Sequence, residues 1–167
     1  MILPKIQQYL LLLSVVLFTA CGIKKETSFS KEALRDVLID TSGKSIPLET
    51  VLASNTKQKK VLVVWASWCR DCLNDSEKLT ALEKEFTDVE FLYLSLDRSL
   101  KDFKVAATKY HIGAQHYWLA SGWEGPLGSF LQLSWIPRYL VLDEANEIIV
   151  FNATEASSQQ IAESLKK

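Results

Sequence analysis

The sequence predicts an α/β fold in which a mixed β-sheet is covered by helices on both faces. An apolar run at residues 61–66 is followed by a segment with helical periodicity, and the same strand-then-helix order repeats at 89–96 and 100–110. Two further apolar runs, 139–142 and 148–151, are separated by a polar turn and are typical of an antiparallel hairpin. Strands and helices that alternate in this way build layered α/β domains.

The segment before the first of these strands is expected to add a second hairpin. Residues 34–48 contain two short strand-like stretches on either side of Ser42 and Gly43, a typical turn pair. A short helix is expected at 47–54, and a polar, lysine-rich loop then leads to the strand at 61–66. That strand is apolar throughout, as buried parallel strands are.

The longest predicted helix spans residues 70–86, where leucine and phenylalanine recur on one side and charged residues on the other. Further along the chain, a short edge strand is expected at 116–119. A glycine-containing loop at 121–128 then leads to a short helical segment at 129–133, and its glycine spacing does not match a phosphate-binding loop. A helix at 156–165 is expected to close the fold.

The N-terminus has the pattern of a secretory signal peptide at residues 1–20. Lys5 precedes an apolar stretch that ends at Ala20, and this stretch is shorter than the roughly 20 residues of a membrane span. The residues that end at Cys21 resemble the lipobox of bacterial lipoproteins, which implies a lipid on Cys21, a tether at 21–30 and a domain at 31–167. An ordinary leader with an incidental cysteine is the alternative.

The composition suits one domain of ordinary charge. The chain has 167 residues, of which 48% are hydrophobic, and a formal net charge of -1. Without Lys5 in the leader, 18 basic side chains face 20 acidic ones, a net charge of -2. This balance gives no indication of nucleic-acid binding. Export places the domain in an oxidising compartment, where a reducing dithiol needs an electron donor.

Two cysteines one helical turn apart carry the clearest chemistry in the chain. Cys69 and Cys72 lie where the strand at 61–66 ends and the helix at 70–86 begins. A thiolate at a helix N-terminus meets unpaired backbone N–H groups and the positive end of the helix dipole, which lower its pKa. The pair is therefore predicted to cycle between a dithiol and a disulfide.

The motif Trp65-Ala-Ser-Trp-Cys-Arg-Asp-Cys, together with Trp135-Ile-Pro-Arg-Tyr before the last hairpin, resembles the thioredoxin superfamily. Within it, the chain is similar to the membrane-anchored thiol–disulfide oxidoreductases of the TlpA and ResA type from bacterial envelopes. The resemblance covers residues 34–167. It implies a thioredoxin-like fold, with a central mixed β-sheet flanked by helices and an N-terminal β-hairpin.

The resemblance also implies roles for individual residues. Cys69, expected to be the more exposed thiol, would attack a substrate disulfide, and Cys72 would resolve the mixed disulfide. Pro137 would be cis and face the dithiol, so that the backbone of Ile136 could pair with an extended substrate peptide. Trp68 would line the substrate groove.

Expectations also follow for other residues near the motif. Thioredoxins carry a buried aspartate where this chain has Val63. Asp75 lies where TlpA and ResA proteins often have an active-site glutamate, so it is either a general base for Cys72 or a solvated helix residue. Trp65 is expected in the core, whereas Trp123 and Trp135 are structural residues or line a binding face.

We expect a lipid-anchored, periplasm-facing thiol–disulfide oxidoreductase, most simply a reductant of disulfides in exported proteins, for which cytochrome c maturation is one family role. Its partners would be such a disulfide-containing protein, an electron-donor thiol protein of the membrane, and the membrane itself. No metal or cofactor is expected beyond the Cys69–Cys72 disulfide. A redox-inactive peptide-binding module is one alternative, and metal capture by the two cysteines with ligands from another chain is a second.

Overall fold

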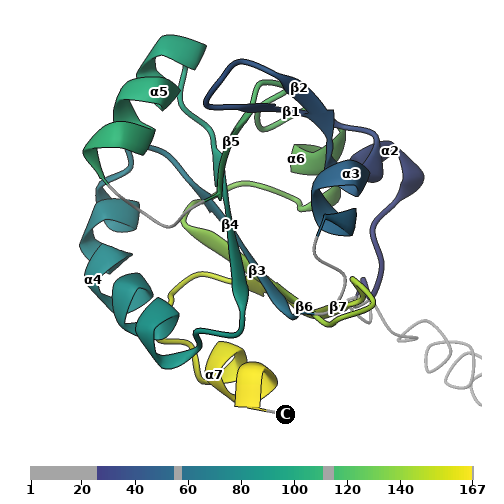
Figure 1. Cartoon of the computed structure of the whole chain (residues 1–167), viewed down its shortest axis with the longest axis vertical. Coiled ribbons are helices and arrows are strands. Elements are labelled where there is room, and N and C mark those ends of the chain that lie inside the picture. The colour runs from purple at the N-terminus through teal and green to yellow at the C-terminus, as the bar shows by residue number, and fades with distance from the viewer. Residues whose placement is uncertain (1–25, 55–57, 111–114, 167) are drawn as a thin grey trace, which may run out of the picture.

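A computed structural model describes residues 26–54, 58–110 and 115–166 and builds them around one seven-stranded sheet. The strand order is β2-β1-β5-β4-β3-β6-β7, and helices cover both faces (Figure 1). The strands are β1 (Val37–Asp40), β2 (Ser45–Pro47), β3 (Lys60–Trp65), β4 (Glu90–Ser95), β5 (Gln115–Leu119), β6 (Arg138–Leu142) and β7 (Ile148–Ala153). The predicted α/β class with a mixed sheet is confirmed.

The helices form two layers, with α4 and α5 on one side of the sheet and α2, α3 and α6 on the other (Figure 1). Helix α7 packs on β6 and β7 and pairs with α4 through Lys166 and Glu85. The helices are α2 (Lys31–Leu34), α3 (Leu48–Ala53), α4 (Arg70–Glu85), α5 (Leu100–Lys109), α6 (Pro126–Phe130) and α7 (Gln159–Lys166).

The centre of the sheet is β3, which runs parallel to β4 and antiparallel to β6. Every residue of these three strands is buried, as the uniformly apolar run at 61–66 predicted. The two predicted hairpins are also present, because β1 pairs antiparallel with β2 and β6 with β7. The carboxyl end of β3 thus leads from the core directly into the CxxC segment.

A strand is present at 115–119 as predicted, but the prediction that it lies at an edge of the sheet is wrong. Strand β5 lies inside the sheet, parallel to β4 on one side and antiparallel to β1 on the other. The N-terminal hairpin covers the edge that β5 would otherwise expose. This pairing joins segments some eighty residues apart, so local sequence patterns do not report it.

Two helix boundaries differ from those predicted. Helix α6 begins at Pro126 instead of residue 129, because Pro126 suits a first helical turn and the Asp36 carboxylate accepts the Leu127 N–H at 2.9 Å. Helix α7 begins at Gln159 instead of residue 156, because the Ala156 N–H donates to Asp75. Helix α2 was not predicted, although Ser30 caps it by accepting the Ala33 N–H.

The predicted signal peptide at 1–20 and the predicted lipidation site Cys21 lie outside the described residues. In the part of the chain that the structure covers, no helix is long and apolar enough to cross a membrane.

Candidate active site

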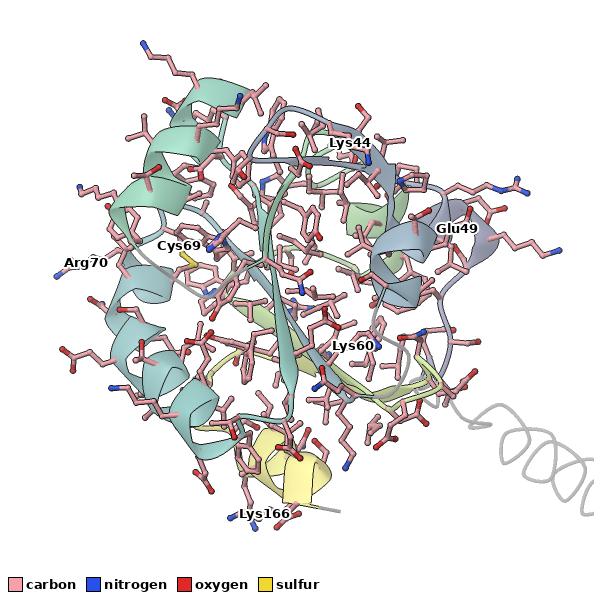
Figure 2. The ribbon with its side chains drawn as sticks, viewed as in Figure 1. Lys44, Glu49, Lys60, Cys69, Arg70 and Lys166 are labelled. Carbon is pink, nitrogen blue, oxygen red and sulfur yellow. A yellow bond between two sulfur atoms is a disulfide. The ribbon has the colours of Figure 1, made fainter. Side chains whose placement is uncertain are left out.

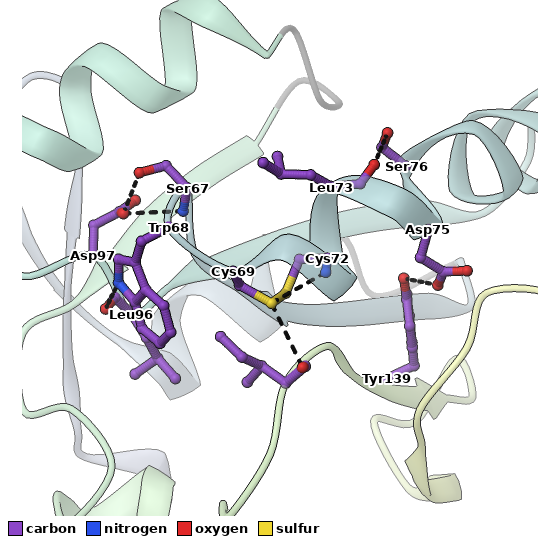
Figure 3. The surroundings of a disulfide bond; sticks show 11 residues. Ser67, Trp68, Cys69, Cys72, Leu73, Asp75, Ser76, Leu96, Asp97 and Tyr139 are labelled. Atoms are coloured by element: carbon purple, nitrogen blue, oxygen red, sulfur yellow. Dashed lines mark hydrogen bonds between the residues drawn. A yellow bond between two sulfur atoms is a disulfide. The ribbon is translucent and has the colours of Figure 1, made fainter.

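Cys69 and Cys72 form a disulfide at the start of α4, with their Cα atoms 5.3 Å apart (Figure 3). Cys69 is the N-cap residue of α4, and its Sγ accepts the Cys72 N–H at 3.1 Å. The pair therefore lies at the end of β3 and the beginning of a helix, as predicted. On reduction, the same N–H and the helix dipole would stabilise a thiolate on Cys69.

The expectation that Cys69 is the more exposed cysteine is wrong for this oxidised form. Cys69 is 6% exposed and Cys72 is 8% exposed, so burial does not distinguish them. The reason is that the segment before β6 packs against Cys69, a contact between distant parts of the chain. Arg70, between the cysteines, points away from the disulfide into solvent (Figure 2).

The Ile136–Pro137 peptide bond is cis, as expected from the resemblance. The Ile136 carbonyl oxygen lies 3.6 Å from Cys69 Sγ, and the Ile136 side chain is buried. These two residues lead into β6, which pairs with β3. The sheet register therefore brings the backbone of Ile136 beside Cys69, where an extended peptide could pair with it.

Asp75 is a buried residue of α4, 6% exposed, which contradicts the alternative of a solvated helix residue. Its Oδ2 accepts two hydrogen bonds of 2.7 Å, from the Tyr139 hydroxyl and the Ala156 N–H. Its Oδ1 lies 3.5 Å from Lys78 Nζ and accepts no hydrogen bond from the described residues. The carboxylate is thus held by hydrogen bonds at one oxygen and by the Lys78 ammonium group beside the other.

A small internal cavity of about 10 Å³ lies against Cys72, on the inner side of α4. Val63, at the position where thioredoxins carry an aspartate, lines it, as do Ser76 and Tyr139. This volume is about that of a single water probe. Cys72 therefore faces a mainly apolar space, and Tyr139, one of its lining residues, donates its hydroxyl hydrogen to Asp75.

Asp97 supports the loop before Cys69, a role that the sequence analysis missed. It follows β4 and is 4% exposed. Its Oδ1 accepts the Ser67 N–H at 3.0 Å and the Ser67 hydroxyl at 2.7 Å (Figure 3). Its Oδ2 accepts the Ser95 hydroxyl. Asp97 therefore anchors the loop that carries Cys69. The available signal was an acidic residue at the end of the apolar run 89–96.

The tryptophans of the two motifs have different environments. Trp65 is buried, 2% exposed, and contacts Tyr110 edge-on, so the core prediction is confirmed. Trp68 is 47% exposed and lines two surface pockets of about 340 and 430 Å³. Trp123 lines the larger of these pockets, and Trp135 is 58% exposed in a separate one. Accessible indole rings thus flank the disulfide on two sides.

Burial shifts the pKa of several titratable groups in the protein core. Burial and the hydrogen bond to Asp75 raise the pKa of Tyr139, and burial and Glu83 raise the pKa of Tyr93. Burial lowers the pKa of His116 to about 4, so this imidazole is neutral at pH 7. Both tyrosines therefore remain hydrogen-bond donors at physiological pH.

Within the described residues, no group of three or more His, Cys, Asp or Glu side chains could hold a metal ion. His116 stacks on Tyr93 in the core, with ring centroids 5.0 Å apart. His111 lies outside the described residues. The chemistry that the described residues support is thiol–disulfide exchange at Cys69 and Cys72.

The fold has many solved counterparts. A Bacteroides vulgatus protein described as a candidate thiol–disulfide oxidoreductase superposes with a TM-score of 0.67 at 24% identity, over 87% of this chain and 91% of that one. A thiol–disulfide oxidoreductase from Bacteroides fragilis superposes with a TM-score of 0.65 at 19% identity, over 81% of this chain and 98% of that one. A secreted Mycobacterium tuberculosis disulfide oxidoreductase superposes with a TM-score of 0.57 at 20% identity, over 81% of this chain and 97% of that one. At these identities the likeness establishes the fold.

No curated protein sequence matches the chain significantly. The family model described as thioredoxin-like matches residues 58–148, which is more than half of the chain and includes the CxxC motif and Pro137. The TlpA and ResA resemblance is consistent with this match. The chain therefore belongs to the thioredoxin-like family.

Proposed function

We propose that this protein is a thiol–disulfide oxidoreductase that reduces disulfides in exported proteins. The observation that carries the proposal is the Cys69–Cys72 disulfide at the N-terminus of α4, with the Ile136 carbonyl 3.6 Å from Cys69 Sγ. The cysteines form the reacting pair, and the backbone next to Pro137 offers a place for the substrate strand. The CxxC segment thus carries out the exchange, and the segment at Pro137 positions the substrate strand.

Reduction of a substrate disulfide proceeds in two exchange steps. The Cys69 thiolate bonds to one substrate sulfur, the substrate S–S bond breaks, and the other substrate sulfur leaves as a thiolate that takes a proton from water. The Cys72 thiolate then bonds to Cys69 Sγ, and the bond between Cys69 and the substrate breaks. Two electrons have passed to the substrate, and the protein retains the Cys69–Cys72 disulfide.

The second step needs Cys72 to lose its proton. We assign that proton to Asp75, whose Oδ1 is not occupied by a hydrogen bond and whose partner Tyr139 lines the cavity against Cys72. Asp75 is then the general base and Tyr139 the residue that positions it.

The setting of this chemistry is part of the proposal. The N-terminal sequence supports export and a lipid anchor on Cys21, which would place the domain at a bacterial envelope membrane, facing the periplasm. Acyl chains contribute about 0.8 kcal/mol per buried CH₂, so a multiply acylated cysteine holds a domain firmly at a membrane. In that oxidising setting, a second thiol protein must return Cys69 and Cys72 to the dithiol form.

A redox titration tests the proposal. The full-length protein, in detergent, is equilibrated in thiol–disulfide buffers, and its free thiols are counted by alkylation and mass spectrometry. We expect a reversible two-electron couple near or below about -230 mV, typical of reductants. The variant Cys69→Ser should show no intramolecular couple.

Other outcomes would change the assignment. A couple near about -120 mV would indicate an oxidant instead of a reductant. A wild-type protein without a reversible Cys69–Cys72 couple would contradict the oxidoreductase proposal and favour a redox-inactive peptide-binding module.

A further inference from the structure

A groove of about 400 Å³ lies beside the disulfide, on the side away from Trp68. Three segments form it: the first turns of α4, the chain before β6, and the chain after β7. Its principal residues are Asp71, Asp75, Lys78, Trp135, Pro137 and Glu155. Pro137 follows Ile136, whose carbonyl is next to Cys69, so the groove begins where a substrate strand would lie.

The groove carries an excess of negative charge. It contains three carboxylates and one ammonium group, a formal charge of -2. Lys78 Nζ lies 3.5 Å from both Asp75 Oδ1 and Glu155 Oε2 and offsets only part of this charge. Asp71 is exposed at the mouth of the groove. A cationic ligand would complete the charge balance.

A buried oxygen in the groove points to the same ligand. Asp75 is only 6% exposed, and its Oδ2 accepts two hydrogen bonds. Asp75 lines the groove, and its buried Oδ1 lies 3.5 Å from Lys78 Nζ and accepts no hydrogen bond from the described residues. Buried polar atoms are rarely left in this state, so a donor from outside the chain is expected.

Trp135 adds a surface suited to a cation. Its side chain is 58% exposed, although it adjoins the buried Ile136. An indole face attracts guanidinium and ammonium groups, and more strongly when the cation is partly desolvated, as it would be in a groove. Carboxylates around an accessible indole are the groups that bind an arginine or lysine side chain.

The opposite side of the disulfide lacks this bias. In the pocket between Trp68 and α5, Arg98 and Lys109 offset Asp97 and Asp102, and the Asp97 carboxylate is already hydrogen-bonded to Ser67 and Ser95. The charges there cancel. The two flanks of the site therefore differ, and a substrate strand would meet negative charge on one flank only.

We infer that the groove between Trp135 and Asp71 is a specificity subsite for an arginine or lysine side chain next to the reactive cysteine of the substrate polypeptide. The inference rests on the proposed oxidoreductase function and names the class of disulfide it prefers. The aromatic ring would stack on the cation, the carboxylates would neutralise it, and the substrate cysteine would be held at Cys69.

Matched peptides test the subsite in two ways, both with the full-length protein in detergent. The first measures the rate at which the reduced protein opens disulfide peptides that differ only in Arg, Gln or Glu beside the cysteine. The second measures the affinity of the oxidised protein for the same peptides with Ser in place of Cys, which cannot react. At low salt, we expect both the exchange rate and the affinity to be about tenfold higher for the Arg peptide than for the Glu peptide. At high salt the difference should be smaller.

Variants assign the effect to the groove. Asp71→Asn combined with Glu155→Gln should reduce the ratio of the Arg-peptide rate to the Glu-peptide rate to within about twofold. Trp135→Leu should lower the exchange rate of the Arg peptide more than that of the Gln peptide. Glu77→Gln removes the same charge from the exposed part of α4 outside the groove and should preserve the ratio. Because each ratio is taken within one variant, changes in thiol reactivity cancel.

The two proposals fail in different ways. Equal rates and equal affinities for all three peptides would overturn the subsite and leave the oxidoreductase function standing. Selective binding of the Arg peptide by the oxidised protein, without exchange of any disulfide, would support the subsite and contradict the oxidoreductase.

Discussion

Tyr139 of β6 donates its hydroxyl hydrogen to Asp75 of α4, with 2.7 Å between Tyr139 Oη and Asp75 Oδ2. The Ala156 N–H donates to the same oxygen at 2.7 Å. Three segments that are distant in the sequence thus meet at one carboxylate, one helical turn after Cys72. Figure 3 shows the contact between Tyr139 and Asp75. The contact joins the proton chemistry proposed for Cys72 to the strand that follows Pro137.

Asp75→Asn should slow the resolving step. An asparagine keeps the shape of the side chain and one acceptor oxygen but cannot take a proton at neutral pH, and a general base contributes at least about 100-fold. Mixed disulfide between Cys69 and a substrate should therefore accumulate, which acid quenching and mass spectrometry would detect. Glu77→Gln should resolve normally. Wild-type resolution in Asp75→Asn would refute the assignment.

Tyr139→Phe should destabilise the protein by about 1.5–3 kcal/mol, the usual value of a hydrogen bond to a charged group. Urea unfolding would measure this loss. Tyr93→Phe is a matched control, because the Tyr93 hydroxyl donates to the half-buried Glu83 instead, and its loss should cost less. Tyr139→Phe should also shift the pH dependence of mixed-disulfide resolution, whereas Tyr93→Phe should not. Unchanged pH profiles in both would limit Tyr139 to a structural role.

His116 should make the free energy of unfolding depend on pH between 6.5 and 4. Burial lowers its pKa to about 4 in the folded protein from 6.5 in the unfolded chain. The unfolded chain therefore binds more protons in this window, so stability is full above pH 6.5 and falls as the pH falls. The loss should reach about 3 kcal/mol at pH 4.

Urea unfolding of His116→Phe at several pH values checks this expectation. The variant should lack that part of the pH dependence, whatever its absolute stability. His111→Phe changes the other histidine of the chain and should retain the wild-type slope. If the curves of wild type and His116→Phe ran parallel, another group would account for the acid sensitivity.

Gly128→Ala should destabilise the protein by about 1–3 kcal/mol, the usual cost of an added group that does not fit. Gly128 is buried in α6, and a Cβ there would overlap the carbonyl oxygens of Gly122 and Trp123. Ser129→Ala, on the exposed neighbour, should change stability by less than about 0.5 kcal/mol. Thermal or urea unfolding would compare them, and equal stabilities would show that the loop yields to the added methyl group.

Much of the architecture could be predicted from the sequence because its signals are local. An apolar run, a helical period or a turn pair reports the preference of a few neighbouring residues, so β3, α4 and both hairpins were expected close to where they lie. The position of β5 in the sheet and the start of α6 were predicted wrongly. Each depends on a partner far along the chain, β1 in one case and Asp36 in the other.

The candidate site divides in the same way. Cys69, Cys72 and Pro137 stand in short motifs whose residue types carry their chemistry, so the sequence alone was enough to single them out. The burial of Cys69, the anchoring of its loop by Asp97, and the meeting of Tyr139 with Asp75 required the folded chain. Hydrogen bonds and burial depend on which segments pack together, and that packing is a property of the whole sheet.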